Sequence, residues 1–265
     1  RRPTSSRSRS TRCASRRSTR APPPRTSCTP PAPPTCATRG SAACGSCAAA
    51  RTSRSATSRA PCAAPSRRNY AERTMAVLPI ATIGHPELRI RAAEVDPAEL
   101  ATPEVQGFID DLVETMRAAN GAGLAATQVL RHQRICAVEV NKNPRYPYKP
   151  QVPLTILVNP VLTPLDDDMF ENNEGCLSVP GFRGNVMRHT SIRVRALDRH
   201  GAPIDGVIRG MTACTYQHEV DHLDGMLFPD RVTDPRTFTT WDSFDKFHHH
   251  DFVIRVKELV ARFGS

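Results

Sequence analysis

The chain has 265 residues, of which 39% are hydrophobic and 23% charged, and a net charge of +10 at pH 7. It has no apolar run of about 18 residues and no stretch with the pattern of a secretion signal, so the sequence predicts neither a membrane span nor export. Six of its nine cysteines lie in the first 74 residues and three in the remainder, an arrangement that excludes a disulfide framework and fits a reducing compartment.

The first 74 residues differ sharply from the rest. They contain 16 arginines, no lysine and one acidic residue, a net charge of +15, whereas residues 75–265 carry 20 basic and 25 acidic residues, a net charge of −5. The overall basic charge therefore does not indicate a specific nucleic-acid-binding protein. Residues 1–74 also lack Val, Ile, Leu, Met, Phe and Trp, so this Arg/Ser/Pro/Ala-rich leader is predicted to be disordered.

Three interpretations of the leader remain open. It is an organellar transit peptide, a basic tail that binds anionic partners, or an untranslated stretch with Met75 as the true start. The composition of the leader favours the untranslated stretch. Residues 75–265 are then one folded domain of 191 residues in a bacterial-type cytoplasm. A mitochondrion or plastid is expected instead if the leader is a transit peptide.

Elements of both kinds are predicted within residues 75–265. A helix begins at Thr102-Pro103, carries apolar residues at helical spacing and stops at Asn120-Gly121. Strands are predicted over 134–140, 154–159, 191–197 and 202–209. An exposed loop is predicted over 141–153, and helices over about 211–223 and over 252–263. The pattern predicts an α+β fold with antiparallel sheets packed around the helix at 211–223, plus an N-terminal sheet-packing helix and a C-terminal helix.

Residues 217–222 read QHEVDH and place two histidines four residues apart. On a helix, His218 and His222 share one face and can bind one metal ion, while Glu219 can act as a general base toward a water activated by that ion. This spacing indicates metal-dependent hydrolysis.

The third metal ligand is open on spacing alone. The histidines at 248–250 form one run, which is more typical of a solvated surface. Cys176, in the segment EGCLS at 174–178, offers a thiolate, although a lone cysteine is more often a small buried residue.

A glycine-rich segment at 121–128 reads GAGLAATQ. Its glycines allow close approach of backbone to a ligand, and Gln128 offers an amide donor that can stabilise an oxyanion. No lysine follows these glycines, so the segment is not a nucleotide-binding P-loop.

Taken in order, these segments resemble the three motifs of the peptide deformylase family, GxGLAAxQ, EGCLS and QHExDHLxG. They stand at 121–128, 174–178 and 217–225 with every fixed position matched, and the resemblance spans roughly 78–236. It implies an enzyme that removes the formyl group from N-terminal formyl-methionine of newly made polypeptides and releases formate.

The resemblance also implies roles for individual residues. Cys176, His218 and His222 would bind one divalent metal, Fe²⁺ in the working enzyme, with Zn²⁺, Ni²⁺ and Co²⁺ also compatible. Glu219 would be the general base, and the side chain of Gln128 and the backbone N–H of Leu177 would stabilise the oxyanion.

Substrate contacts are expected from a further set of residues. Glu174 would organise the cysteine loop and Arg183 would flank the peptide path, with a loop salt bridge or a solvated charge as the equally open alternative for this pair. Helical spacing puts Met211 and Cys214 on the metal-facing side, where they form either a pocket for an unbranched side chain or simply core. Gly123 would let backbone approach the substrate.

Partners and alternatives complete the sequence-based predictions. Basic residues 255, 257 and 262 either touch ribosomal RNA or form a solvated helix face, which is the commoner case. The rival enzyme is an HExxH endopeptidase with a later ligand. The third alternative is a non-catalytic metal-stabilised binding module, which Glu219 disfavours because a structural site needs no base.

Overall fold

The computed structural model describes residues 74–143 and 145–265, and the predictions made for residues 1–73 lie outside this part. The strands are β1 (Gly123–Ala125), β2 (Ile135–Val140), β3 (Val152–Pro164), β4 (Met169–Cys176), β5 (Val179–His189), β6 (Ser191–Leu197), β7 (Pro203–Arg209) and β8 (Thr239–Thr240). The α-helices are α1 (Pro97–Leu100), α2 (Pro103–Ala118), α3 (Gly210–Leu223), α4 (Trp241–Phe247) and α5 (His249–Phe263). Short 3-10 turns are η2 (Pro86–Arg89), η3 (Ala126–Val129), η4 (Phe228–Arg231) and η5 (Pro235–Thr237).

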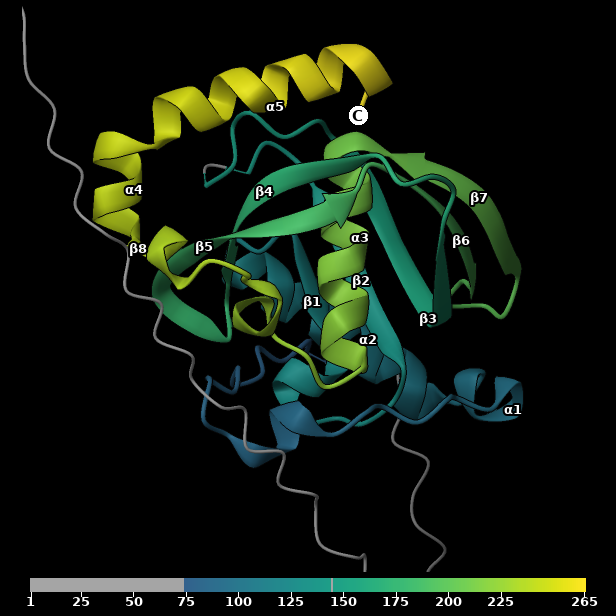
Figure 1. The fold of residues 1–265 in the computed structure, drawn as a ribbon. Coiled ribbons are helices and arrows are strands. Elements are labelled where there is room, and N and C mark those ends of the chain that lie inside the picture. Colours follow the sequence, from purple (N-terminus) through teal and green to yellow (C-terminus); the bar gives the residue numbers. More distant parts are fainter. Residues whose placement is uncertain (1–73, 144) are drawn as a thin grey trace, which may run out of the picture. The chain divides into compact units, whose positions relative to one another are not determined.

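Two antiparallel sheets surround the helix α3. One has the strand order β1-β2-β3-β6-β7 and the other β4-β5-β8. Figure 1 shows α3 in the middle of the domain, with β4 and β5 crossing it on one side and the longer sheet curving around it on the other. The predicted α+β class with sheets around a central helix is confirmed.

The helix α2 covers one face of the five-stranded sheet. Its N-terminus is capped by Thr102, whose hydroxyl accepts a hydrogen bond from the Val105 N–H. Pro103 occupies the first turn, where its missing N–H would have had no helical hydrogen-bond partner. Its apolar stripe packs on alternate residues of β2, Ile135 and Ala137. The helix predicted from the apolar spacing is therefore confirmed.

The opposite face of the same sheet packs on α3. Cys136 and Val138, which alternate with the residues under α2, lie in a second core cluster with Ala213, Tyr216 and Leu223 of α3. Because β2 is covered on both faces, every residue from Ile135 to Val138 is buried. The position of α3 is thus set by the pleat of one strand.

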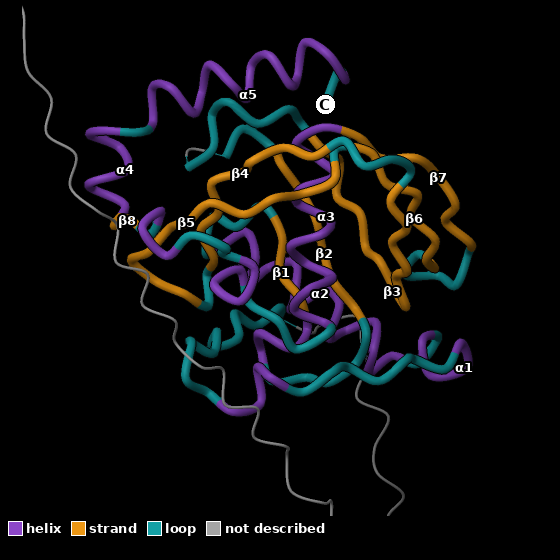
Figure 2. Tube along the Cα trace, viewed as in Figure 1, coloured by secondary structure: helices purple, strands orange, loops and turns teal. Residues whose placement is uncertain are grey.

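The hairpin formed by β4 and β5 was not predicted from the sequence. These strands pair from Met169 opposite His189 to Gly175 opposite Arg183, and they hold the EGCLS segment at the turn end. Figure 2 shows the hairpin as a pair of strands passing beside α3. The predicted loop at 141–153 was partly wrong, because β3 begins at Val152 and several loop side chains are half-buried.

The C-terminal helices close one end of the domain. Helix α5 begins at His249, three residues before its predicted start, and buries Phe252, Val256 and Leu259 against Met211 and a residue of α4. Figure 1 shows α5 lying across the end of the domain where α3 begins. None of the helices in the described part is both long and apolar enough to cross a membrane.

Candidate active site

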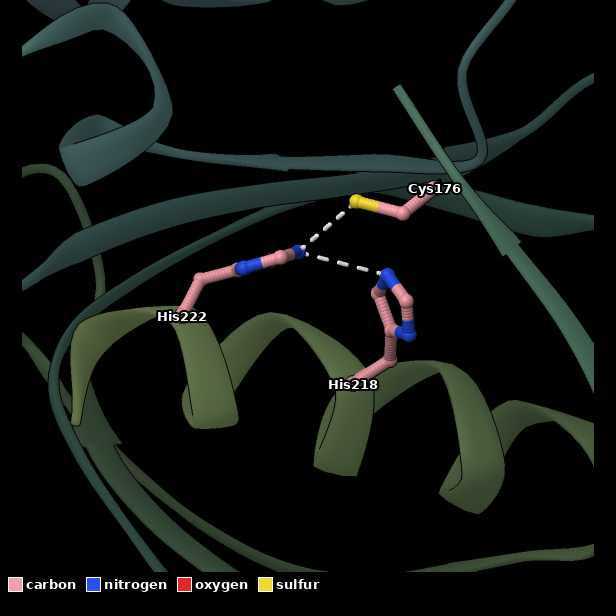
Figure 3. Close-up of side chains that lie close together, drawn as sticks. All are labelled: Cys176, His218 and His222. Atoms are coloured by element: carbon pink, nitrogen blue, oxygen red, sulfur yellow. Dashed lines mark hydrogen bonds between the residues drawn. The ribbon is translucent and has the colours of Figure 1, made fainter. Parts of the chain in front are cut away.

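Three ligand-type atoms converge between the end of β4 and the middle of α3. The Nε2 atoms of His218 and His222 are 3.3 Å apart, and Cys176 Sγ is 3.3 Å from His222 Nε2. The side-chain donor atoms of the three residues all lie within 4.8 Å of one another. Figure 3 shows both imidazoles rising from adjacent turns of α3 toward the Cys176 sulfur.

The chemistry of this donor set fits a divalent transition metal. The Glu174 carboxylate lies 2.8 Å from His218 Nδ1 and accepts its hydrogen bond, so that in the neutral ring the Nε2 lone pair is left for a metal ion. A sulfur and two imidazole nitrogens are ligands that zinc and ferrous iron accept. Three protein ligands also leave a coordination position for a reactant.

Glu174 belongs to a buried charge network. Arg188 donates to both Glu174 carboxylate oxygens at 2.8 Å and to Asp221 Oδ2 at 2.6 Å, and Arg231 pairs with Asp221 from outside. Burial alone would raise the pKa of Glu174, but Arg188 and His218 hold it well below its usual value. A carboxylate kept ionised in this way can orient His218 permanently.

Glu219 lies beside the ligand cluster, and one of its carboxylate oxygens is not hydrogen-bonded within the described part of the chain. The residue is 4% exposed, and within the described part its buried Oε2 has no hydrogen-bond partner. Burial raises the pKa of Glu219 to about 7, although the nearby charge of His218 opposes the shift. A carboxyl group tuned to neutral pH can both accept and return a proton.

The glycine segment fits closely against this carboxylate. A Cβ on Gly123 would lie 2.3 Å from Glu219 Oε1, so only glycine allows β1 to run this close to α3. Gln128 is fixed by the Ala125 N–H, which donates to its Oε1 at 2.9 Å. Its Nε2 donates to Ser178 Oγ at 3.0 Å and lies 3.6 Å from Cys176 Sγ.

A cavity of about 50 Å³ opens beside Glu219. Of the residues singled out from the sequence, it is lined by Gly123, Gln128, Glu174, Cys176, Leu177, Arg183, Met211, Cys214, His218 and Glu219. Met211 and Cys214 lie on the metal-facing side of α3, as helical spacing predicted, and their side chains are also core residues. The pocket and core interpretations of these two residues are therefore compatible.

Arg183 is buried to a degree that its expected place beside the peptide path did not suggest. It is 1% exposed, with its guanidinium 4.2 Å from the ring of Trp241 and 4.3 Å from the ring of Phe244. It donates to the Asn173 side chain at 2.6 Å and to the Asn173 carbonyl at 2.7 Å. Arg183 thus forms part of the cavity wall, packed against two aromatic residues of α4.

Several wall residues were missed from the sequence: Tyr146, Tyr148, Lys149, Asn172, Thr215 and Phe252. The first three belong to the segment that had been assigned to an exposed loop. Its tyrosines were the available signal, since a buried aromatic with a polar tip commonly lines a site. The ion partner of Glu174, Arg188, carried no signal because the pairing depends on the register of β4 and β5.

Comparisons with known proteins agree on one family. The family model described as polypeptide deformylase matches residues 77–238. Peptide deformylase 1 of Nitrosomonas europaea is 44% identical over 167 residues, covering 63% of this chain and 94% of that protein. Peptide deformylase of Pseudomonas aeruginosa is 44% identical over 159 residues, covering 60% of this chain and 89% of that protein.

Solved structures give the same picture. The Met-Ala-Ser-bound class I type b peptide deformylase of Acinetobacter baumannii superposes with a TM-score of 0.58 at 38% identity, covering 60% of this chain and all of that one. A peptide deformylase of Synechococcus elongatus in complex with actinonin gives a TM-score of 0.53 at 27% identity, covering 76% of this chain and 94% of that one.

Proposed function

The chain belongs to the polypeptide deformylase family, and from that membership we propose how its own residues perform the reaction. The enzyme removes the formyl group from the N-terminal formyl-methionine of newly made polypeptides and releases formate. The observation that carries the assignment of residues is the convergence of Cys176, His218 and His222 beside the buried carboxylate of Glu219.

Cys176, His218 and His222 would hold one divalent metal ion. Such an ion, when bound, supplies Lewis acidity toward water and the formyl carbonyl. Fe²⁺ is the working ion in our proposal, and the same sulfur and nitrogen donors are compatible with Zn²⁺, Ni²⁺ and Co²⁺. Glu174 keeps the His218 ring in the orientation and tautomer that a ligand needs.

Glu219 takes a proton from the attacking water at Oε2 and passes it to the leaving amine. The unpartnered Oε2 and the pKa of about 7 support both halves of this transfer. The amide nitrogen leaves as a free amine, and the carbon leaves as formate. Gln128 and the Leu177 backbone N–H donate to the oxyanion that forms in between.

Gly123→Ala is expected to reduce kcat/KM by about 10²-fold, because the new Cβ would push the Glu219 carboxylate from its position. Steady-state formate release from formyl-Met-Ala-Ser measures the effect. Gly206→Ala is the matched control, since a Cβ on this strand glycine meets no atom within 4 Å. Equal activity of the two variants would remove the close approach from the mechanism.

Cys176→Ala is expected to weaken metal binding by at least about 100-fold, since losing even an outer partner of a ligand costs 10–100-fold. Metal per chain after equilibration with a competing chelator measures this. Cys136→Ala, at a buried thiol in β2, should keep its metal. An HExxH endopeptidase that uses a later ligand would retain metal in both variants, and so contradict the proposal.

We propose further that residues 75–265 form the catalytic domain and act on formyl-methionyl nascent peptides in a bacterial-type cytoplasm. An organelle is the alternative if residues 1–74 act as a transit peptide. A ribosomal-RNA contact through α5 is disfavoured, because Arg255 pairs with Glu171 and Arg262 pairs with Asp168 within the domain.

A further inference from the structure

The cavity beside Glu219 has more polar groups than an apolar methionine side chain requires. Met211, Leu177 and Phe252 supply apolar surface. The remaining wall includes polar side chains that are not metal-ligand candidates: Asn172, Lys149, Arg183 and Thr215. Pockets for apolar groups are usually lined by apolar and aromatic residues with only a few polar atoms.

Lys149 brings a cationic group to this cavity. The residue is half-buried, its Nζ donates to Thr215 Oγ1 at 3.1 Å, and Nζ lies 4.8 Å above the ring of Tyr146. An ammonium carries three N–H donors, so the Thr215 bond leaves donors for a guest. Desolvation lowers the pKa of Lys149, and the nearby thiol of Cys214 and carboxylate of Glu174 oppose that shift.

A further polar atom in the wall is unpaired in the described part of the chain. Asn172 Oδ1 is buried without a hydrogen-bond partner, and the residue is 6% exposed. Buried polar groups in native proteins nearly always have partners. This wall therefore suits a guest that itself carries a polar atom.

The position of Lys149 matches the reach of the first side chain of the substrate. Thr215 precedes Glu219 by four residues on α3, so Lys149 Nζ lies beside a point roughly one helical turn, ~6 Å, from the base. Five covalent bonds separate the formyl carbon from the sulfur of formyl-methionine, a reach of roughly 6 Å. A first side chain that enters this cavity would thus be long enough to bring its sulfur to the part of the wall that Lys149 lines.

We propose that Lys149 is a specificity-determining residue that lets the enzyme deformylate peptides beginning with formyl-methionine sulfoxide. Methionine sulfoxide has the methionine chain plus one oxygen on sulfur, a strong acceptor that Lys149 Nζ can donate to. The reaction itself is unchanged: water adds to the formyl carbon, the C–N bond breaks, and the amine takes the proton. The sulfoxide is neither reduced nor oxidised. This inference rests on the proposed deformylase function.

The test compares formate release from formyl-Met-Ala-Ser and from the same peptide with methionine sulfoxide first. In the wild-type chain, kcat/KM for the sulfoxide peptide is expected to lie within about 10-fold of that for the methionine peptide. Lys149→Met keeps length and removes the charge, so the sulfoxide-to-methionine ratio should fall by about 10–100-fold, chiefly through KM, as expected for a hydrogen bond to a charged group. Turnover of the methionine peptide is measured in the same variant, so that the ratio separates loss of the hydrogen bond to the sulfoxide from a general loss of turnover.

Lys142→Met is the matched control, because Lys142 lies in the same connection between β2 and β3 but is exposed. It should behave as wild type. An unchanged ratio in Lys149→Met, or a wild-type enzyme that rejects the sulfoxide peptide by more than about 10³-fold, would overturn the inference. Loss of turnover of both peptides by the wild-type enzyme would instead contradict the deformylase function.

Thermal unfolding of Lys149→Met is followed alongside. If that variant does not fold, Lys149→Gln replaces it, because glutamine keeps a neutral donor of similar length. The ratio is then expected to fall by about 5–10-fold, since a hydrogen bond from a neutral donor is weaker than one from a charged donor. A ratio equal to that of wild type would overturn the inference in this case as well.

Discussion

Glu219→Gln is expected to lower kcat for formate release from formyl-Met-Ala-Ser by about 10²–10⁴-fold, the usual contribution of a positioned general base. Glutamine has nearly the same shape as glutamate but cannot take the proton from water. The contacts with Gly123 therefore remain while the proton transfer is lost. KM should change little, because Glu219 does not hold the peptide.

Two measurements make this prediction specific. Metal content per chain should equal that of wild type, since Glu219 is not among the three converging donors. Glu258→Gln, at an exposed position of α5, should retain full activity. Substantial turnover by the Glu219 variant with metal bound would assign the base to another group.

Arg188→Met should lower the free energy of unfolding by about 3–5 kcal/mol, the cost of breaking a buried ion pair from one side. The side chain of Arg188 is 2% exposed, and its loss leaves Glu174 buried opposite a missing cation. Asp221 keeps Arg231 but loses its inner partner. Urea denaturation of the metal-free chain measures the change without the added stability that a bound metal gives.

Arg193→Met is the matched control for this effect. Arg193 also forms a two-pronged pair, with Asp205, but both side chains are about half exposed. Solvent screens such a pair, so its loss should have little effect on unfolding. If both arginine variants unfolded at the same urea concentration, the buried network would not stabilise the fold as we infer.

The helices were predicted from the sequence where apolar spacing and caps agreed. Helix α2 has Thr102 as its cap, Pro103 in its first turn and a regular apolar face, so each local signal indicates the same element. Helix α3 was predicted from the histidine spacing, and it ends before Gly225, whose φ is +75°. The strands β2, β6 and β7 and the middle of β3 were found as short strand-like runs, with the turn at 198–201 separating β6 from β7.

The β4–β5 hairpin could not be predicted in the same way. Its buried side chains include Asn172, Glu174 and Arg188 on one face and Arg183 on the other, where an ordinary strand would have apolar residues. Alternation of apolar and polar residues is therefore absent. In a strand that forms an active-site wall, polar site residues take the place of buried apolar ones, so the two-residue alternation that would identify the strand is lost.

For the candidate site too, some residues could be found from the sequence and others only from the fold. Helical spacing alone identified His218, Glu219 and His222. Cys176 and Gln128 were candidates by their chemistry, and the family resemblance chose between the alternatives left open for them. The segment containing Lys149 was assigned to an exposed loop because proline, tyrosine and lysine are common there, and only the fold reveals its contact with Thr215. Contacts between segments far apart in sequence depend on tertiary packing, which local composition does not encode.

The enclosure of α3 by both sheets also determines which parts of the domain can unfold locally. Of its 14 residues 12 are buried, and its ends are tied by the Met211 N–H to the Ser265 carbonyl and by the Ala92 N–H to the Leu223 carbonyl. Backbone amides in such an element exchange with solvent only when the whole domain unfolds. The two imidazoles therefore stay in register through local fluctuations, whereas the two-residue strand β8 at the sheet edge can separate without disturbing them.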